Sequence, residues 1–186
     1  MKIEDSNFSG DSSNIIFITG GTKSGKSEFA EHLAKKAKKL SYVALSEINN
    51  NDKEWQRKIN IHRERRPKNW KLIETTDLLT TLNQEDGPLL IDSIGGFVME
   101  SIDRDNKEWL AMIDSLIFLL KKRRSLTFIV GEQVGWSLVS EYKIGNTYIE
   151  RIGELQKRIT KISKDNWLTI NGRAIKIDEI SIEIPT

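Results

Sequence analysis

One segment constrains this chain more than any other, the run from Gly20 to Ser27 with the sequence Gly-Gly-Thr-Lys-Ser-Gly-Lys-Ser. It matches the pattern G-x-x-x-x-G-K-[ST], in which successive backbone N–H groups curl around phosphate oxygens. The pattern has this meaning only after a buried strand and at the start of a helix. Residues 15–19 form an apolar, β-branched run typical of a buried strand, and apolar residues recur at helical spacing from Lys26 onwards. The sequence therefore predicts a phosphate-binding loop between a strand and a helix.

The residue types in this loop suit a nucleoside triphosphate and Mg²⁺. Lys26 is expected to reach the β- and γ-phosphates, and the Ser27 hydroxyl is expected to hold Mg²⁺. A second Mg²⁺ ligand is predicted at Asp92, because residues 89–92 read as an apolar strand that ends in a carboxylate. The nucleotide-binding candidates in the loop are Gly20, Gly21, Thr22, Lys23, Ser24, Gly25, Lys26 and Ser27.

Strand-like and helix-like segments alternate along the rest of the chain. Strands are expected at 15–19, 41–46, 71–74, 88–92, 126–130, 167–171 and 174–177, with a hairpin turn at Asn171-Gly172-Arg173. Helices are expected at 26–39, where a lysine run would close the helix, and at 52–66, 105–124 and 146–163. This order predicts an α/β fold with a mainly parallel sheet, flanked by helices and ending in a hairpin. Residues 1–14 read as a flexible extension and residues 15–186 as a single nucleotide-binding catalytic domain.

Composition excludes several classes of protein. The 186 residues include no cysteine, which excludes disulfide scaffolds, thiolate metal sites and cysteine nucleophiles. No apolar run approaches 18 residues and no secretory leader is apparent at Met1, so we expect a cytoplasmic protein without a membrane span. A net charge of +2 is too small to argue for a nucleic-acid partner.

The near-neutral total conceals a basic segment, residues 57–71, with seven basic residues and one acid. On a helix, His62 would share a face with Trp55, Ile59 and Arg66. The pattern leaves open whether His62 is a structural core or interface group or a nucleophile. It also leaves open whether the basic run is a solvated face or an RNA-facing patch. A neutral imidazole can attack phosphorus and form a labile phosphoramidate, and neighbouring guanidinium groups would lower its pKa and keep it neutral.

The combined motifs resemble, in order and spacing, the bifunctional adenosylcobinamide kinase/adenosylcobinamide-phosphate guanylyltransferase family. The resemblance spans residues 15 to about 178, and the His-Arg-x-x-Arg-Pro-x-x-Trp segment is its most specific part. The motifs that carry it are the loop at 20–27, Tyr42-Val43-Ala44-Leu45-Ser46, Glu54-Trp55, Lys58-Ile59, His62-Arg63, Arg66-Pro67, Trp70, Glu74 and Leu90-Ile91-Asp92.

This resemblance implies a cytoplasmic, usually homotrimeric enzyme of cobalamin biosynthesis with a RecA-like P-loop fold. The family phosphorylates the aminopropanol hydroxyl of adenosylcobinamide with ATP or GTP. It then transfers GMP from GTP through a histidine, giving adenosylcobinamide-GDP and pyrophosphate. By position, His62 would carry the GMP, and Glu74 would accept hydrogen bonds from the guanine base. The other residues implied to line the nucleotide site are Ala44, Leu45, Ser46, Arg63, Glu64, Arg65, Arg66 and Asp92.

The second half departs from the family pattern. The usual Asn-Glu-Val-Gly is replaced by Glu132-Gln133-Val134-Gly135, and Gly95-Gly96 and Glu100 replace polar positions after Asp92. Two alternatives therefore stay open: a P-loop small-molecule kinase without nucleotidyl transfer, and a degenerate nucleotide-binding protein with a regulatory role.

Overall fold

The computed structural model describes residues 13–37, 39–45, 66–136 and 140–185. Its centre is a seven-stranded sheet in the order β3-β2-β4-β5-β1-β6-β7. All neighbouring strands are parallel except β6 and β7, which form an antiparallel hairpin. The strands are β1 (Ile15–Gly20), β2 (Ser41–Leu45), β3 (Lys71–Thr75), β4 (Leu89–Asp92), β5 (Thr127–Glu132), β6 (Asp165–Ile170) and β7 (Arg173–Lys176). The predicted α/β fold, with a mainly parallel sheet and a C-terminal hairpin, is confirmed.

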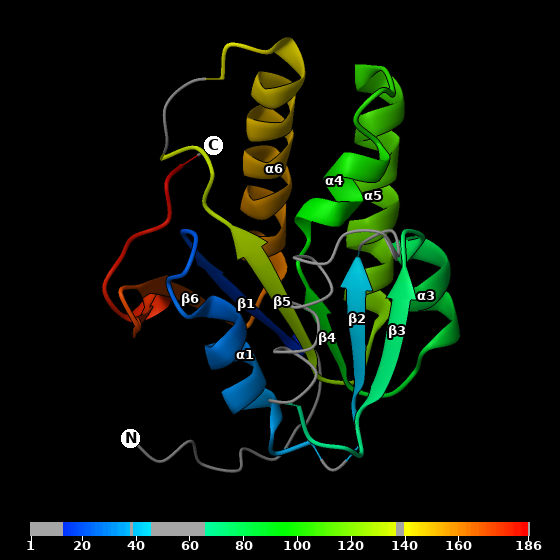
Figure 1. Ribbon diagram of the computed structural model, residues 1–186, viewed down its shortest axis with the longest axis vertical. Helices are drawn as coiled ribbons and strands as arrows, with labels where there is room; N and C mark the ends of the chain where they lie inside the picture. The colour runs from blue at the N-terminus through cyan, green and yellow to red at the C-terminus, as the bar shows by residue number, and fades with distance from the viewer. Residues whose placement is uncertain (1–12, 38, 46–65, 137–139, 186) are drawn as a thin grey trace, which may run out of the picture.

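Helices cover both faces of this sheet (Figure 1). Helix α1 packs on one face, while α3, α4, α5 and α6 contribute to the apolar core on the other. The helices are α1 (Lys26–Ala34), α3 (Leu78–Gln84), α4 (Gly95–Glu100), α5 (Asn106–Lys122) and α6 (Lys143–Ile162), and a 3-10 turn, η1, spans Ile177–Glu179. No helix in the described ranges is both long and apolar enough to cross a membrane.

Alternation along the strands divides the core into two clusters, because successive side chains of a strand point to opposite faces. Phe17 and Val43 pack with the four-helix side, whereas Ile18, Tyr42 and Leu90 pack with α1. All five side chains are at most 2% exposed. The central strands β1, β2 and β4 are therefore buried on both sides, as expected for parallel strands.

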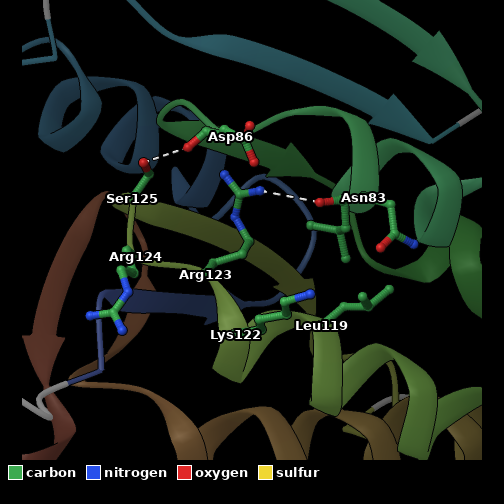
Figure 2. A pocket seen from close by; sticks show the side chains of 8 residues that line it. Asn83, Asp86, Leu119, Lys122, Arg123, Arg124 and Ser125 are labelled. Carbon is green, nitrogen blue, oxygen red and sulfur yellow. Dashed lines mark hydrogen bonds between the residues drawn. The ribbon is translucent and has the colours of Figure 1, made fainter.

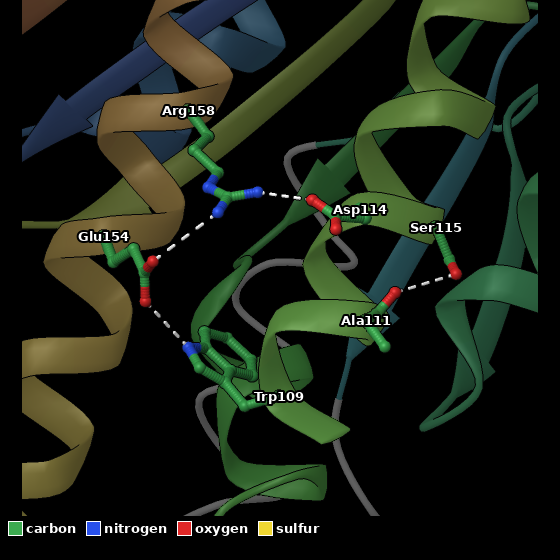
Figure 3. A network of polar contacts seen from close by, with 6 residues as sticks. All are labelled: Trp109, Ala111, Asp114, Ser115, Glu154 and Arg158. Atoms are coloured by element: carbon green, nitrogen blue, oxygen red, sulfur yellow. Dashed lines mark hydrogen bonds and ion pairs between the residues drawn. The ribbon is translucent and has the colours of Figure 1, made fainter. Parts of the chain in front are cut away.

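Helices α5 and α6 are the two long amphipathic helices expected from the sequence, and their apolar stripes are buried. Helix α5 begins with a capping box. The Asp105 carboxylate accepts from the backbone N–H of Glu108, and the Glu108 carboxylate accepts from the backbone N–H of Asp105. Figure 3 shows how polar contacts join the two helices: the indole N–H of Trp109 donates to Glu154 at 3.0 Å, and Arg158 contacts both Glu154 and Asp114.

The structure differs from the sequence expectations at several elements. Helix α1 ends at Ala34 instead of continuing through the lysine run, because the chain turns there and buries Leu40 before β2. Strand β5 continues to Glu132, paired with β1, instead of ending at Val130. Helices α3 and α4 were not expected. The predicted helix at 52–66 lies outside the described residues except for its last residue, and most of the predicted extension, residues 1–12, also lies outside them.

Candidate nucleotide-binding site

The predicted phosphate loop connects the carboxyl end of β1 to the first residue of α1. Gly25 is the N-cap of α1 with φ 94°, a left-handed conformation that glycine adopts without strain, and no side chain caps the helix. The first N–H groups of the helix therefore remain available to an anion at this end, where the helix dipole is positive. The Lys26 ammonium lies over the same loop, 3.3 Å from the carbonyl oxygen of Gly21.

The C-terminal hairpin of β6 and β7 contacts this loop through hydrogen bonds to Ser24. The Ser24 hydroxyl lies 2.8 Å from the Thr169 hydroxyl, which donates to the Thr19 carbonyl at 3.2 Å. The backbone N–H of Gly172, in the turn between β6 and β7, donates to the Ser24 carbonyl at 3.0 Å. Because Ser24 is only 6% exposed, its side chain supports the loop rather than facing a ligand.

The two predicted Mg²⁺ ligands are brought together by the fold. The Ser27 hydroxyl donates to Asp92 Oδ1 at 3.1 Å, joining the first turn of α1 to the end of β4. A hydroxyl and a carboxylate are hard oxygen donors, and Mg²⁺ takes few such ligands from protein because water and phosphate oxygens complete its shell. No group of three or more His, Cys, Asp or Glu residues able to hold a metal occurs within the described part of the chain. The donor set fits a phosphate-bound Mg²⁺ held by Ser27 and Asp92.

Two other predicted residues lie in one row with Asp92 across neighbouring strands. Ala44 of β2 is in register with Asp92 of β4 on one side and with Glu74 of β3 on the other. Strands are about 4.8 Å apart, so Glu74 and Asp92 have backbones roughly 10 Å apart. Glu74 is exposed. Glu74 therefore lies two strands away from Asp92, on the same row.

Leu45 fits the predicted set less well. Its side chain is 7% exposed and packs in the cluster on the four-helix face, opposite the face with α1. Only its main chain is therefore available to a ligand on the α1 face. Four other predicted binding residues, Ser46, Arg63, Glu64 and Arg65, and the predicted nucleophile His62 lie outside the described residues.

Arg66, the last residue of the predicted basic helix, is described and is anchored beside the site. Its guanidinium carbon lies 3.3 Å from the centroid of the Tyr42 ring, a cation–π contact, and its Nε lies 3.9 Å from Glu31 Oε1. The Tyr42 hydroxyl in turn donates to Asp92 Oδ2. The segment that carries His62 therefore ends in contact with a group that touches the predicted metal ligand.

Glu132 lies beside the phosphate loop, although it was not among the residues predicted to form the site. It ends β5 in register with Gly20, and its carboxylate accepts from the Ser93 hydroxyl and from the Gly95 N–H. Burial raises the pKa of Glu132 to about 7, although the nearby Lys26 ammonium acts in the opposite direction. The sequence did contain an indication of an unusual carboxylate here, because Glu132 replaces the Asn of the family pattern. Its place beside the loop depends on β5 lying next to β1, which is a property of the fold.

A pocket of about 440 Å³ lies elsewhere, between the end of α3 and the end of α5 (Figure 2). Its residues precede β4 and β5, so it lies at the amino ends of the parallel strands, opposite the phosphate loop. The Arg123 guanidinium, at the centre of the pocket, donates hydrogen bonds to the carbonyl oxygens of Leu82, Glu85 and Gly87. This pocket has a structural arginine and is not the predicted nucleotide site.

Comparison with known protein families gives a match over most of the chain. The CobU family, described as cobinamide kinase/cobinamide phosphate guanyltransferase, matches residues 16–177. The bifunctional adenosylcobalamin biosynthesis protein CobU of Escherichia coli K12 is 28% identical over 181 residues, covering 88% of this chain and 99% of the relative. The protein CobP of Pseudomonas aeruginosa, with the same description, is 28% identical over 161 residues, covering 83% of this chain and 92% of the relative.

Solved structures with low sequence identity share the fold. The assembled ATPase EscN of the enteropathogenic E. coli type III secretion system gives a TM-score of 0.54 at 13% identity, covering 84% of this chain and 43% of EscN. A protein from Pyrococcus horikoshii OT3 gives 0.51 at 6% identity, covering 94% of this chain and 93% of that protein. The likeness to an ATPase agrees with the predicted P-loop NTPase fold. Since the family match takes in every described residue of the site, the chain belongs to the CobU family of cobinamide kinase/cobinamide phosphate guanyltransferases.

Proposed function

We propose that this protein phosphorylates adenosylcobinamide with ATP or GTP and then transfers GMP from GTP to the resulting phosphate, giving adenosylcobinamide-GDP and pyrophosphate. The observation that carries the proposal is the contact between Ser27 and Asp92 at the open end of α1, in a chain whose family performs these two reactions. Loop N–H groups and Lys26 would bind the triphosphate, and Ser27 and Asp92 would hold Mg²⁺, which neutralises phosphate charge when bound.

His62 is the proposed nucleophile of the second reaction. Its imidazole nitrogen would form a bond to the α-phosphorus of GTP while the bond to the pyrophosphate oxygen breaks. The adenosylcobinamide phosphate oxygen would then displace the histidine. Support comes from Arg66, four residues after His62, which packs on Tyr42 beside Asp92. Glu74, exposed on β3 and in the Asp92 row, is the proposed acceptor for the guanine N1–H and amino group.

Covalent labelling tests the histidine assignment directly. Incubation with Mg²⁺ and GTP labelled in the α-phosphate should leave an acid-labile, base-stable GMP adduct on the wild-type protein. His62→Ala should abolish the adduct. His32→Ala is the matched control and should keep it, because His32 is an exposed residue on α1. A wild-type protein that binds GTP but never becomes labelled would contradict the proposed transfer.

Product analysis separates this proposal from a kinase without nucleotidyl transfer. Both enzymes form adenosylcobinamide phosphate, and the kinase step does not require His62. Only the bifunctional enzyme forms adenosylcobinamide-GDP and pyrophosphate, and this product should be lost in His62→Ala while the phosphate product remains.

The cytoplasmic location and the homotrimer implied by the family resemblance belong to the same proposal. Sedimentation velocity measures the oligomeric state.

A further inference from the structure

Tyr42 occupies the middle of β2, where an aromatic residue is ordinarily a packing group. Its side chain is 2% exposed, and its ring stacks with Trp70 at a centroid distance of 6.5 Å. Its hydroxyl nevertheless reaches past the apolar cluster and donates to Asp92 on the neighbouring strand β4. Phenylalanine would satisfy the packing equally well, so packing alone does not account for the hydroxyl.

The hydroxyl completes a pair of contacts that fixes the Asp92 carboxylate. Oδ1 accepts from Ser27 on α1, and Oδ2 accepts from Tyr42 on β2. With one oxygen held from each side, the carboxylate cannot rotate about its Cβ–Cγ bond without breaking a hydrogen bond. Without the Tyr42 hydroxyl, only the Ser27 contact of this pair would remain, and Ser27 is itself a predicted metal ligand.

The ring of Tyr42 makes a second contact near the site. The Arg66 guanidinium covers the face of the ring, with its carbon 3.3 Å from the centroid. Tyr42 therefore contacts both Arg66, the last residue of the helix predicted at 52–66, and the carboxylate beside the phosphate loop.

We propose that Tyr42 is a positioning residue, whose hydroxyl orients the Asp92 carboxylate for Mg²⁺ and whose ring couples that orientation to Arg66. This inference rests on the proposed function in one respect, the use of Asp92 as a metal ligand. It adds a physical link between the metal ligand and the segment that ends at Arg66. The link runs from Arg66 through the ring and hydroxyl of Tyr42 to Asp92.

The test uses a GTP analogue with a methylene group between the α- and β-phosphorus, which cannot form the GMP adduct. Its affinity is compared with and without Mg²⁺ in the wild type and in Tyr42→Phe, which removes one oxygen and keeps the ring. Calorimetric titration in EDTA should give a Kd within about twofold of the wild type. In Mg²⁺ the gain in affinity over EDTA should be about tenfold smaller, the lower end of the effect of a hydrogen bond to a charged group. Tyr142→Phe removes a hydroxyl from an exposed residue before α6 and should leave both values unchanged.

A second pair of measurements tests the coupling to Arg66. Arg66→Ala should reduce the Mg²⁺-dependent gain in the wild-type background and have no further effect on that gain in the Y42F background. If Y42F is not recovered folded, Arg66→Ala alone decides the link, and an unchanged Mg²⁺-dependent gain overturns it. Equal losses of affinity in Mg²⁺ and in EDTA for Y42F would show a packing role only and would also overturn the proposal.

These binding measurements need neither turnover nor a corrinoid, so they separate this inference from the proposed function. A protein that shows the Tyr42 effect but never forms the GMP adduct contradicts the transfer reaction and leaves the positioning role supported. A protein that forms the adduct while Y42F binds Mg²⁺ and GTP like the wild type contradicts the positioning role alone.

Discussion

The carboxyl group of Glu132 provides a sharp test of the site's electrostatics. Burial raises its pKa from 4.5 to about 7 in the folded protein, while Lys26 opposes the shift and Asp92 adds to it. In the unfolded chain the group returns to an ordinary glutamate pKa. Between these two values the folded protein holds a proton that the unfolded chain has released.

The sign of the effect follows from this difference in proton binding. The stability contribution is fully present below about pH 4.5 and is lost as the pH rises through about 7, because the ionised carboxylate is disfavoured in the folded state. A shift of about 2.5 pKa units corresponds to about 3 kcal/mol at about 1.4 kcal/mol per unit. Glu132→Gln removes this dependence. The free energy of unfolding of the wild type, relative to the variant, should therefore fall by about 3 kcal/mol between pH 4.5 and 8.

Urea denaturation of the nucleotide-free protein in EDTA, repeated across this pH range, measures the difference. Titrating groups that do not interact with residue 132 contribute equally to both proteins and cancel, and a constant offset from the changed hydrogen bonds does not vary with pH. Glu150→Gln, at an exposed position on α6, is the control for replacing a glutamate that is not buried. A flat difference for Glu132→Gln would refute the reasoning, because it would mean that the carboxyl group of Glu132 titrates alike in the folded and unfolded protein.

Three further substitutions test the contacts that support the phosphate loop and the helices. Thr169→Val removes a hydroxyl that contacts the Ser24 hydroxyl at 2.8 Å. It should lower the free energy of unfolding by about 1–2 kcal/mol and weaken GTP binding severalfold. Unchanged GTP affinity would show that the hairpin does not support the loop. The Arg151 guanidinium donates to three carbonyl oxygens between α4 and α5, at 2.5 to 3.1 Å. Arg151→Met removes these donors, and chemical denaturation should show that the free energy of unfolding falls by about 3 kcal/mol. Arg158→Met, at a more exposed ion pair, should cost under about 1 kcal/mol, and similar losses for both arginines would contradict this explanation.

The parts of the fold that were predictable are those that local patterns specify. The phosphate loop has a glycine-rich sequence between an apolar strand and an apolar helical face, and all three appear where expected. Helix α5 has both a buried apolar stripe and a capping box, so its sequence contains its start signal and its packing face. These signals act over a few residues, and no distant contact is needed to interpret them.

The unexpected elements depend on contacts between distant residues. Helix α4 begins with Gly95 and Gly96, which ordinarily disfavour a helix. Here a side chain at Gly96 would collide with the main chain of Leu45, so close packing requires a glycine at this position. A side chain at Gly95 would meet the hydroxyl end of Tyr148, which would have to move. Short α3 has only Leu78, Thr81 and Leu82 to bury, too few residues to show a helical period.

The geometry of the candidate site was predictable only in part, for the same reason. Ser27 and Asp92 were identified from motifs, and their contact follows from the places of α1 and β4 in the fold. Tyr42 was part of a family motif, but nothing in a strand sequence indicates that a central tyrosine hydroxyl reaches a carboxylate on the next strand. Glu132 required the extension of β5 alongside β1, a pairing between residues more than a hundred positions apart.

The hairpin contact with the phosphate loop has a consequence for how the protein is made. Strand β1 lies between β5 and β6, so the first strand has no partner until residues beyond 127 have left the ribosome. The hairpin contacts of Ser24 in the loop form only once Thr169 and Gly172 have been synthesised. A nascent or truncated chain that ends before β6 therefore contains the complete phosphate-binding sequence but not its support. Because such distant pairings form slowly, we expect nucleotide binding to be acquired late, after most of the chain is available.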